Sequence, residues 1–295
     1  MPKIDTHHHL WDQSQRPQTW MTPELDAVIG GPFAMADWAD AAEPAGITHG
    51  VFVQTVPVPD ETPEVLALSQ SHPALAGVVG WIDVASPVPA GDLLDALVDG
   101  PGGRRLVGVR VLAEYVDDLD WLAGDDVAAA AAALGARDLS LDLLTISSQL
   151  PAAARLVAAH PETRFVLDHL SKPTMRLEHL DGWARDLRAL ADAPNVSCKL
   201  SGFMTYDGEP MTAERLQPWF DVAIEAFGPE RLMFGSDWPV SILGGGLVAS
   251  MAVAEALLAP LTLIEQDQVF FGTALHWYPG IAPRVLGTEH DESGH

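Results

Sequence analysis

The stretch Ile4-Asp5-Thr6-His7-His8-His9-Leu10-Trp11-Asp12 lies almost at the N-terminus and reads as the first strand of the chain. Side chains alternate between the two faces of a strand, so His7 and His9 share one face and His8 points to the other. Two imidazoles held this way are half of a divalent metal site or of a polar reaction centre. The alternatives are a tag remnant, which the apolar flanking residues argue against, and a structural polar strand end.

The rest of the chain alternates between strand-like and helix-like patterns. Apolar, β-branched runs predict strands at residues 47–56, 75–84, 106–112, 139–146, 164–170, 195–201 and 231–238. Helical patterns lie between them at residues 35–45, 92–98, 125–134, 151–159, 180–191, 213–227 and 247–258. One more helix opens with Thr62 as its N-cap and Pro63 in its first turn. About eight strands, each followed by a helix, are typical of a (β/α)₈ TIM barrel.

The alternative is a doubly wound sheet, which usually has a glycine-rich first turn that this chain lacks. We expect residues 1–280 to form a single barrel and residues 281–295 to form an acidic, disordered tail. Residues 13–32 read as a long functional loop. Residues 263–275 read as one further amphipathic helix.

Charge and composition narrow the class of function. The chain has 295 residues, with 16 Lys and Arg against 41 Asp and Glu, a formal net charge of −25. Such acidity argues against a nucleic-acid or anionic-membrane partner and favours a small-molecule substrate, with a homo-oligomer as a further option. No run is apolar over the ~20 residues that span a bilayer, so we expect a cytoplasmic protein. Cys198 is the only cysteine, and its strand-like context predicts a buried structural thiol.

Polar residues at the ends of the predicted strands are the candidates for chemistry, because the carboxyl ends of barrel strands carry the active site. This filter selects His7, His9, Gln54, Arg110, His169, Lys199 and Asp237. Asp237 follows an apolar run and two small residues. It is a candidate general base, provided that burial or neighbours bring its pKa towards the working pH, and also a candidate metal ligand or helix cap. His169, beside Asp168, is a candidate metal ligand or hydrogen-bond donor to a carbonyl oxygen or oxyanion.

The remaining candidates would contact the substrate. Gln54 is polar in an otherwise apolar run, which suggests that it faces the site. Arg110 and Lys199 each fit either substrate recognition or pairing with a buried acid. The tryptophans that flank the site could stack on a sugar ring or exclude water; they are Trp11, Trp20 and Trp238.

Taken together, these motifs resemble the amidohydrolase superfamily, and within it the sugar lactonase group of L-fuconolactonase and L-rhamnonolactonase relatives. The resemblance spans residues 4–278 and rests on the opening strand, Val107-Gly108-Val109-Arg110, Leu167-Asp168-His169-Leu170-Ser171-Lys172-Pro173, Cys198-Lys199-Leu200-Ser201-Gly202 and Phe234-Gly235-Ser236-Asp237-Trp238-Pro239. It implies hydrolysis of a lactone. Asp237 would be the general base, His7, His9 and His169 would polarise the carbonyl directly or through a metal, and Arg110 would bind polar substituents.

The chain departs from the group at two places, of which the first concerns the packing of the C-terminal end and the second the metal. The chain has Thr273 where the group usually has Asn, and Arg110 stands on the fourth strand, where binuclear members carry a bridging lysine. We therefore expect one zinc-like ion, with His7, His9, His169 and Asp237 as ligands, or none. Because lactones are activated esters, we hypothesise that the metal is present but dispensable. The competing functions are a metal-dependent decarboxylase of an aromatic or unsaturated acid and a barrel that has lost its chemistry.

Overall fold

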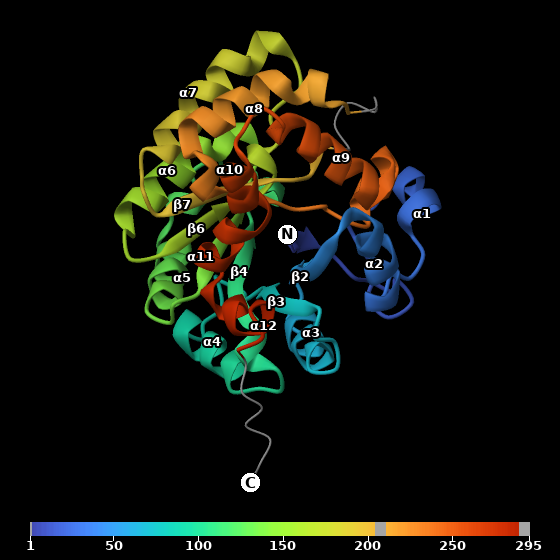
Figure 1. The fold of residues 1–295 in the computed structure, drawn as a ribbon. Coiled ribbons are helices and arrows are strands. Elements are labelled where there is room, and N and C mark those ends of the chain that lie inside the picture. The colour runs from blue at the N-terminus through green and yellow to red at the C-terminus, as the bar shows by residue number, and fades with distance from the viewer. Residues whose placement is uncertain (1, 204–210, 289–295) are drawn as a thin grey trace.

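The computed structural model describes residues 2–203 and 211–288. Its eight strands form one parallel sheet in sequence order, and helices surround it (Figure 1). The strands are β1 (Lys3–His8), β2 (Ile47–Val53), β3 (Leu75–Gly80), β4 (Leu106–Leu112), β5 (Ser140–Leu144), β6 (Arg164–Leu167), β7 (Val196–Leu200) and β8 (Leu232–Phe234). Backbone hydrogen bonds join the two edges: Asp237 N donates to His7 O (2.8 Å) and His9 N to Trp238 O (2.7 Å). The predicted (β/α)₈ barrel is confirmed.

The helices follow the strands around the barrel (Figure 1). Their bounds are α1 (Pro23–Ile29), α2 (Met35–Ala42), α3 (Glu61–Ser69), α4 (Ala90–Val98), α5 (Asp125–Gly135), α6 (Leu150–Ala159), α7 (Leu180–Ala191), α8 (Ala213–Phe227), α9 (Gly246–Leu258), α10 (Leu263–Asp267), α11 (Thr273–Trp277) and α12 (Ala282–Val285). One large apolar cluster fills the layer between sheet and helices. Its burial supplies most of the favourable free energy of folding. Within the described ranges, no helix is both long and apolar enough to cross a membrane.

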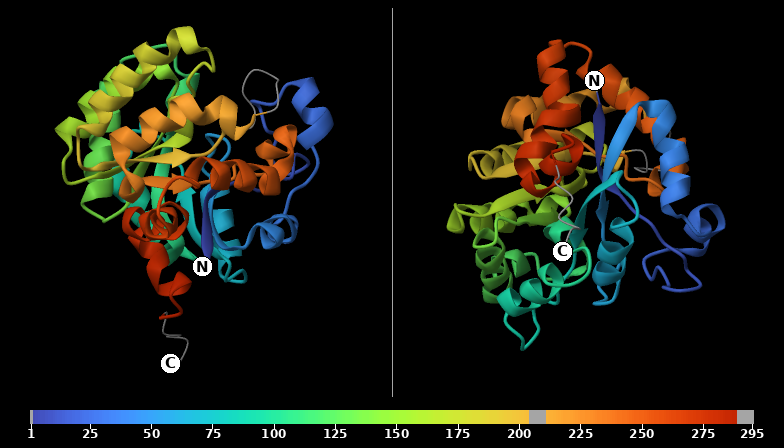
Figure 2. Two further views of the ribbon diagram at one scale, coloured as in Figure 1. Left: turned by 45° about the horizontal axis from the view of Figure 1, so that its top comes forward. Right: turned by 60° about the horizontal axis from the view of Figure 1, so that its bottom comes forward.

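The C-terminal helices close the end of the barrel at which the strands begin (Figure 2). A second apolar cluster joins the strand interior, including Ile4 and Val107, to Tyr278 and Ile281. Ser140 Oγ, at the start of β5, donates to Trp277 O (2.6 Å). Trp277, Tyr278 and Ile281 thus form a C-terminal plug that fills the amino end of the barrel. The opposite, carboxyl end is therefore the one that can carry a site.

Several local predictions were wrong at the ends of elements. The predicted loop over residues 13–32 contains α1, which Thr22 caps by accepting a hydrogen bond from Leu25 N. Thr62 is not an N-cap, because α3 begins at Glu61 and the Thr62 hydroxyl instead accepts a hydrogen bond from Trp81 N (2.9 Å). The predicted strands over 75–84 and 164–170 end at Gly80 and Leu167. Tertiary hydrogen bonds decide these boundaries, which local patterns describe poorly.

The predictions for the C-terminal region also need correction. The helix expected over residues 263–275 is interrupted by a π-helical turn at Gln268–Gly272. The first part of the expected disordered tail packs on the barrel: Ile281 is fully buried, and residues 282–285 form α12. Arg284 Nη2 donates to Arg104 O (2.7 Å), which ties α12 to the turn before β4. Residues 289–295 of the predicted tail lie outside the described residues.

Candidate active site

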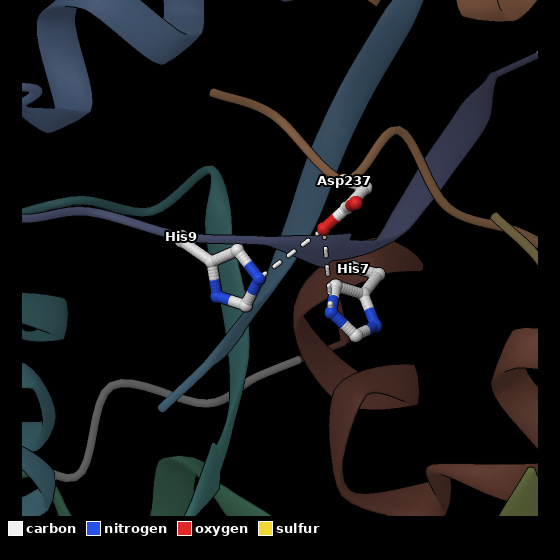
Figure 3. Close-up of side chains that lie close together, drawn as sticks. All are labelled: His7, His9 and Asp237. Atoms are coloured by element: carbon white, nitrogen blue, oxygen red, sulfur yellow. Dashed lines mark ion pairs between the residues drawn. The ribbon is translucent and has the colours of Figure 1, made fainter. Parts of the chain in front are cut away.

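The end of β1 meets the segment after β8 at three side chains (Figure 3). His9 Nε2 lies 3.3 Å from Asp237 Oδ1, and His7 Nε2 lies 3.8 Å from the same oxygen. His7 is fully buried, and His9 and Asp237 are 5% and 6% exposed. The structure therefore brings together three of the predicted site residues, two from the N-terminal strand and one from a segment more than two hundred residues later.

Asp5 and two small residues place Asp237 beside the histidines. The Asp5 carboxylate accepts hydrogen bonds from Ser236 N (2.7 Å) and Ser236 Oγ (2.6 Å), which fastens the segment after β8 to β1. A Cβ atom on Gly235 would lie 2.6 Å from His7 Cβ, so this close approach requires glycine. Asp237 itself has a left-handed backbone (φ 55°), which turns its carboxylate into the barrel.

The hydrogen-bonding pattern of His9 is compatible with a cation between His9 and Asp237. His9 Nδ1 lies 2.7 Å from Val53 O, and because a carbonyl oxygen only accepts, Nδ1 carries the proton. In the neutral ring, Nε2 then presents a lone pair to the Asp237 carboxylate, and only a proton or a metal ion can bridge two acceptors. Tetrahedral zinc ligands at ~2.0–2.1 Å lie roughly 3.3 Å apart, close to the spacing of this pair. The residues thus fit a divalent metal ion.

His7 has the partner that metal-binding histidines commonly have. Its Nδ1 lies 3.3 Å from Asp168 Oδ1 in the barrel interior, as in the carboxylate–histidine pairs that orient metal ligands. His7, His9 and Asp237 form one group with metal-ligand spacing, and His7, Asp168 and His169 form another. Of the four predicted ligands, His169 therefore belongs with Asp168 rather than with His9 and Asp237.

His169 stands on an unusual turn after β6. Four consecutive residues, His169 to Lys172, have left-handed backbones with φ of 54°, 54°, 58° and 44°. Such a conformation costs about 1–2 kcal/mol per residue for side chains other than glycine. Hydrogen bonds hold it in place: Thr145 Oγ1 to Ser171 Oγ (2.7 Å) and Trp183 Nε1 to Leu170 O (2.9 Å). The turn directs both its first and its last side chain towards the pocket described below.

Further contacts fix the His169 ring. Its Nδ1 lies 2.8 Å from Ser201 Oγ. Gly202 leaves room for the ring, because a Cβ atom there would lie 2.5 Å from His169 Nδ1. The ring centroids of His7 and His169 are 4.4 Å apart. The histidine from β6 therefore reaches the cluster of β1, as the strand-end positions predicted.

Beneath the cluster, a network of buried charges fills the barrel. Lys199 Nζ donates to Asp142 Oδ2 (2.6 Å) and lies 3.0 Å from Asp168 Oδ1. Arg110 Nη1 donates to Asp168 Oδ2 (3.3 Å). Tyr278 OH also donates to Asp142 Oδ2 (2.6 Å), which links the C-terminal plug to the network. Lys199, Asp142 and Asp168 are fully buried, so each charge depends on its partners.

Burial and these charges set the protonation of the site. Burial lowers the pKa of His169 to about 4 and that of His7 well below its usual value, although neighbouring carboxylates oppose the shift. Both imidazoles are neutral at pH 7. Burial raises the pKa of Asp237, but the charge that His169 gains once the pH falls to about 4, together with the contact with His9, outweighs it, so that this pKa lies below its usual value. The sequence led us to expect that a base at Asp237 has its pKa raised towards the working pH. The pKa of Asp237 is lowered instead.

The network beneath the site shows opposite shifts in its two acids. Burial raises the pKa of Asp142 to about 6, although Lys199 counteracts it. For Asp168, burial acts in the same direction, but Lys199, His7 and Arg110 together hold its pKa well below the usual value. Asp168 is thus a permanent anion beside His7.

A pocket of about 290 Å³ opens above the cluster at the carboxyl end of the barrel. Its lining residues are His9, Trp20, Thr55, Arg110, Glu114, Tyr115, Leu144, His169, Lys172, Gly202, Asp237 and Val240. Four predicted site residues, His9, Arg110, His169 and Asp237, line it directly. His7, the third member of the cluster with His9 and Asp237, is fully buried and is not among the lining residues.

Four residues predicted to contact the substrate do not line this pocket. Lys199 is fully buried in the network below. The Gln54 side chain donates to Val56 O and Val58 O, both at 2.8 Å, and so organises the loop after β2. Trp11 stacks on His9, with ring centroids 6.3 Å apart, and Trp238 packs edge-on against Phe33. Trp11 and Trp238 therefore pack against neighbouring rings and not against the pocket. Of the three tryptophans predicted to flank the site, only Trp20 lines the pocket.

Sequence reasoning missed Glu114, Tyr115 and Lys172. Glu114 and Tyr115 lie just beyond the last residue of β4, so a strand-end search extended by a few residues would have found them. Lys172 belongs to a motif that was recognised, but nothing local signals the left-handed turn that brings it to the pocket.

Comparison with known proteins now identifies the family. Residues 4–280 match the family described as amidohydrolase. The chain belongs to the amidohydrolase family. It is 31% identical over 295 residues to L-fucono-1,5-lactonase from Burkholderia ambifaria, covering 98% of each chain. The predicted resemblance to the lactonase group is therefore confirmed, as is the prediction that the chain is a hydrolase.

Solved structures agree with this assignment. An amidohydrolase from Burkholderia multivorans with bound zinc is 30% identical, with a TM-score of 0.87, covering 95% of this chain and 99% of that one. More distant is 5-carboxyvanillate decarboxylase from Sphingomonas paucimobilis, at 14% identity and a TM-score of 0.68, covering 94% of this chain and 99% of that one. That likeness concerns the fold alone.

Proposed function

We propose that this protein is a lactonase that opens a small sugar-derived lactone by adding water to its carbonyl carbon. The observation that carries the proposal is the meeting of His7, His9 and Asp237 at the carboxyl end of the barrel, where His9 and Asp237 line a pocket and His7 lies beneath them. The relative named L-fucono-1,5-lactonase supports this choice of substrate class. No observation on the described residues favours the decarboxylase alternative over it.

In this proposal, Asp237 is the general base. Its lowered pKa keeps the carboxylate ionised at neutral pH, so it accepts a proton from water as the water oxygen bonds to the carbonyl carbon. The ring C–O bond then breaks. The departing ring oxygen takes a proton, which Asp237 can return, and the product is a hydroxy acid. His7, His9 and His169 would polarise the carbonyl either directly or through a metal ion that they help to hold, while Arg110 binds polar substituents from its place in the pocket wall.

We further propose that His7, His9 and Asp237 hold one divalent metal ion. The lone pair of His9 that faces the Asp237 carboxylate supports this, as does the bound zinc of the Burkholderia multivorans relative. When bound, the ion would supply Lewis-acid polarisation of the substrate carbonyl. Whether turnover depends on it is a separate hypothesis. Arg110 lines the pocket, and the His169 ring presents an Nε2–H donor there if Ser201 Oγ donates to its Nδ1. Because these groups can donate to an activated ester, we expect residual turnover without metal.

The test is a panel of aldonolactones and simple lactones, assayed by proton release with a pH indicator. Acid production with at least one lactone, and its loss in Asp237→Asn, would support the proposal. A parallel assay for CO₂ from aromatic acids addresses the decarboxylase; gas release without any lactone opening would contradict the lactonase. The same panel after chelation, with metal content measured, addresses the metal. Complete loss of turnover, restored only by a divalent ion, would contradict dispensability.

A further inference from the structure

The pocket contains an ion pair that the proposed chemistry does not use. Glu114 follows β4, and Lys172 ends the left-handed turn after β6; both line the same pocket as Asp237. Lys172 Nζ pairs with Glu114 Oε2. The Glu114 side chain is only 9% exposed and that of Lys172 is 33% exposed. This pair is therefore partly withdrawn from water, unlike the exposed surface pairs, which contribute little.

Hydrogen bonds fix the strained backbone that carries Lys172. Its backbone conformation (φ 44°) is the last of the four left-handed residues. Ser147 Oγ donates to Ser171 O (3.3 Å) and Lys172 O (3.2 Å), which holds the end of the turn. Strained backbone that neighbours hold in place commonly accompanies a functional role. Here the strained turn places an ammonium group in the pocket wall beside Glu114.

The two side chains together match the chemistry of neighbouring hydroxyl groups. A carboxylate offers about four acceptor sites and an ammonium group three donors, so the pair keeps unused sites of both kinds. Each hydroxyl of a polyol both donates and accepts, and two adjacent hydroxyls can bridge the pair. Tyr115, whose hydroxyl interacts with Glu114, adds a third polar group at the same wall.

The charges of the pocket argue against a substrate with an additional carboxylate. Arg110 is paired with Asp168, and Lys172 is paired with Glu114. A carboxylate on the substrate would therefore have to compete with an existing anion for either of these cations. It would also approach the carboxylates of Glu114 and Asp237. A neutral, hydroxylated ring neither competes with these anions for a cation nor is repelled by the two carboxylates.

We propose that Glu114 and Lys172 form a hydroxyl-binding subsite that selects neutral polyhydroxylated lactones over unsubstituted and carboxylated ones. The inference rests on the proposed lactonase function and adds the residues that discriminate among lactones. It assigns them to substrate recognition and not to the chemical step.

The experiment compares wild type, Glu114→Gln and Lys172→Met on three lactones of one ring size: one with ring hydroxyls, one without substituents and one with a carboxylate. We expect each variant to lose about 10- to 100-fold in kcat/KM on the hydroxylated lactone, as for the loss of hydrogen bonds to a charged group. That loss should exceed the loss on the unsubstituted lactone at least tenfold and appear mainly in KM. Glu114→Gln should improve use of the carboxylated lactone, because it frees Lys172, whereas Lys172→Met should not.

Asp95→Asn is the matched control, because it breaks an exposed pair with Arg137 (2.7 Å) and neither of these two residues lines the pocket. Equal losses on hydroxylated and unsubstituted lactones would overturn the subsite while leaving the lactonase function standing. Failure of wild type to open any lactone would instead overturn the lactonase function, and the subsite with it. If Glu114→Gln proves unstable, Lys172→Met alone tests the subsite. The test is then the ratio of its loss in kcat/KM on the hydroxylated lactone to its loss on the unsubstituted one.

Discussion

The two faces of β1 carry the same residue type in opposite roles. On the inner face, His7 and His9 converge on Asp237, and each ring has polar partners. On the outer face, His8 stacks on Trp38, with ring centroids 4.7 Å apart. Neither nitrogen of the fully buried His8 ring has a hydrogen-bond partner among the described residues. Burial alone therefore does not mark a functional histidine, whereas convergence with other strand ends does.

The largest effect is expected from a change of Asp237, on which His7 and His9 of the inner face converge. Asp237→Asn keeps the shape of the side chain but removes its basicity, so we expect kcat/KM for lactone hydrolysis to fall about 10²–10⁴-fold, the usual contribution of a general base. The measurement is steady-state kinetics on the best lactone, with the thermal midpoint as a check on folding. Turnover within threefold of wild type would exclude Asp237 as the base.

The charges beneath the inner face should matter more for folding than for substrate contact. Lys199→Met leaves Asp142 and Asp168 without their shared partner in the barrel interior. We expect a loss of about 3–5 kcal/mol in the free energy of unfolding, because breaking a buried pair strands the remaining charge. Denaturant titration measures it. The double variant Lys199→Met/Asp142→Asn should recover part of the loss, and no recovery would contradict the pairing as the cause.

A smaller effect is expected from the clamp on the left-handed turn. Thr145→Val keeps the side-chain volume but removes the hydroxyl that contacts Ser171. We expect a cost of about 1–3 kcal/mol for a buried hydroxyl left without its partner, together with a lower kcat because His169 loses its fixed position. Thr145→Ser is the control, since it keeps the hydroxyl. Equal kinetics for both variants would argue against any influence of the clamp on the site.

The smallest effect belongs to the outer face. His8→Phe preserves the stacking on Trp38, so we expect lactone turnover within about twofold of wild type and unchanged or higher stability at pH 7. If a large loss of activity accompanied normal folding, the division between the two faces of β1 would be wrong.

His8→Phe should also change how the free energy of unfolding depends on pH. Burial holds the pKa of His8 well below its usual 6.5, so below that pH the unfolded chain binds more protons at this residue than the folded chain. Wild-type stability therefore falls as the pH drops below 6.5 through this window. The variant has no titrating group at this position, so we expect the stability advantage of His8→Phe over wild type to grow as the pH falls, with a slope that rises towards about 1.4 kcal/mol per pH unit well below pH 6.5. Unfolding titrations of both proteins at pH 7, 6 and 5 measure it, and parallel pH profiles would contradict it.

The sequence by itself determined the barrel, because strand and helix periods alternate regularly along the chain and parallel strands must cross over through helices. It also determined which face of β1 carries His7 and His9, since alternation is a property of any strand. The position of Asp237 after the last strand followed from the same reasoning, because strand ends converge at one end of a barrel.

Only the tertiary structure decided how deep each side chain lies. Lys199 lies near the end of β7 and Lys172 shortly after the end of β6, yet Lys199 is fully buried beneath the site and Lys172 lines the pocket. The long-range partners Asp142 and Glu114 distinguish them. Likewise, the left-handed turn from His169 to Lys172 is held by the side chains of Thr145, which directly follows β5, and of Trp183 in α7. Local sequence cannot encode a strained backbone whose stabilising contacts come from elsewhere in the chain.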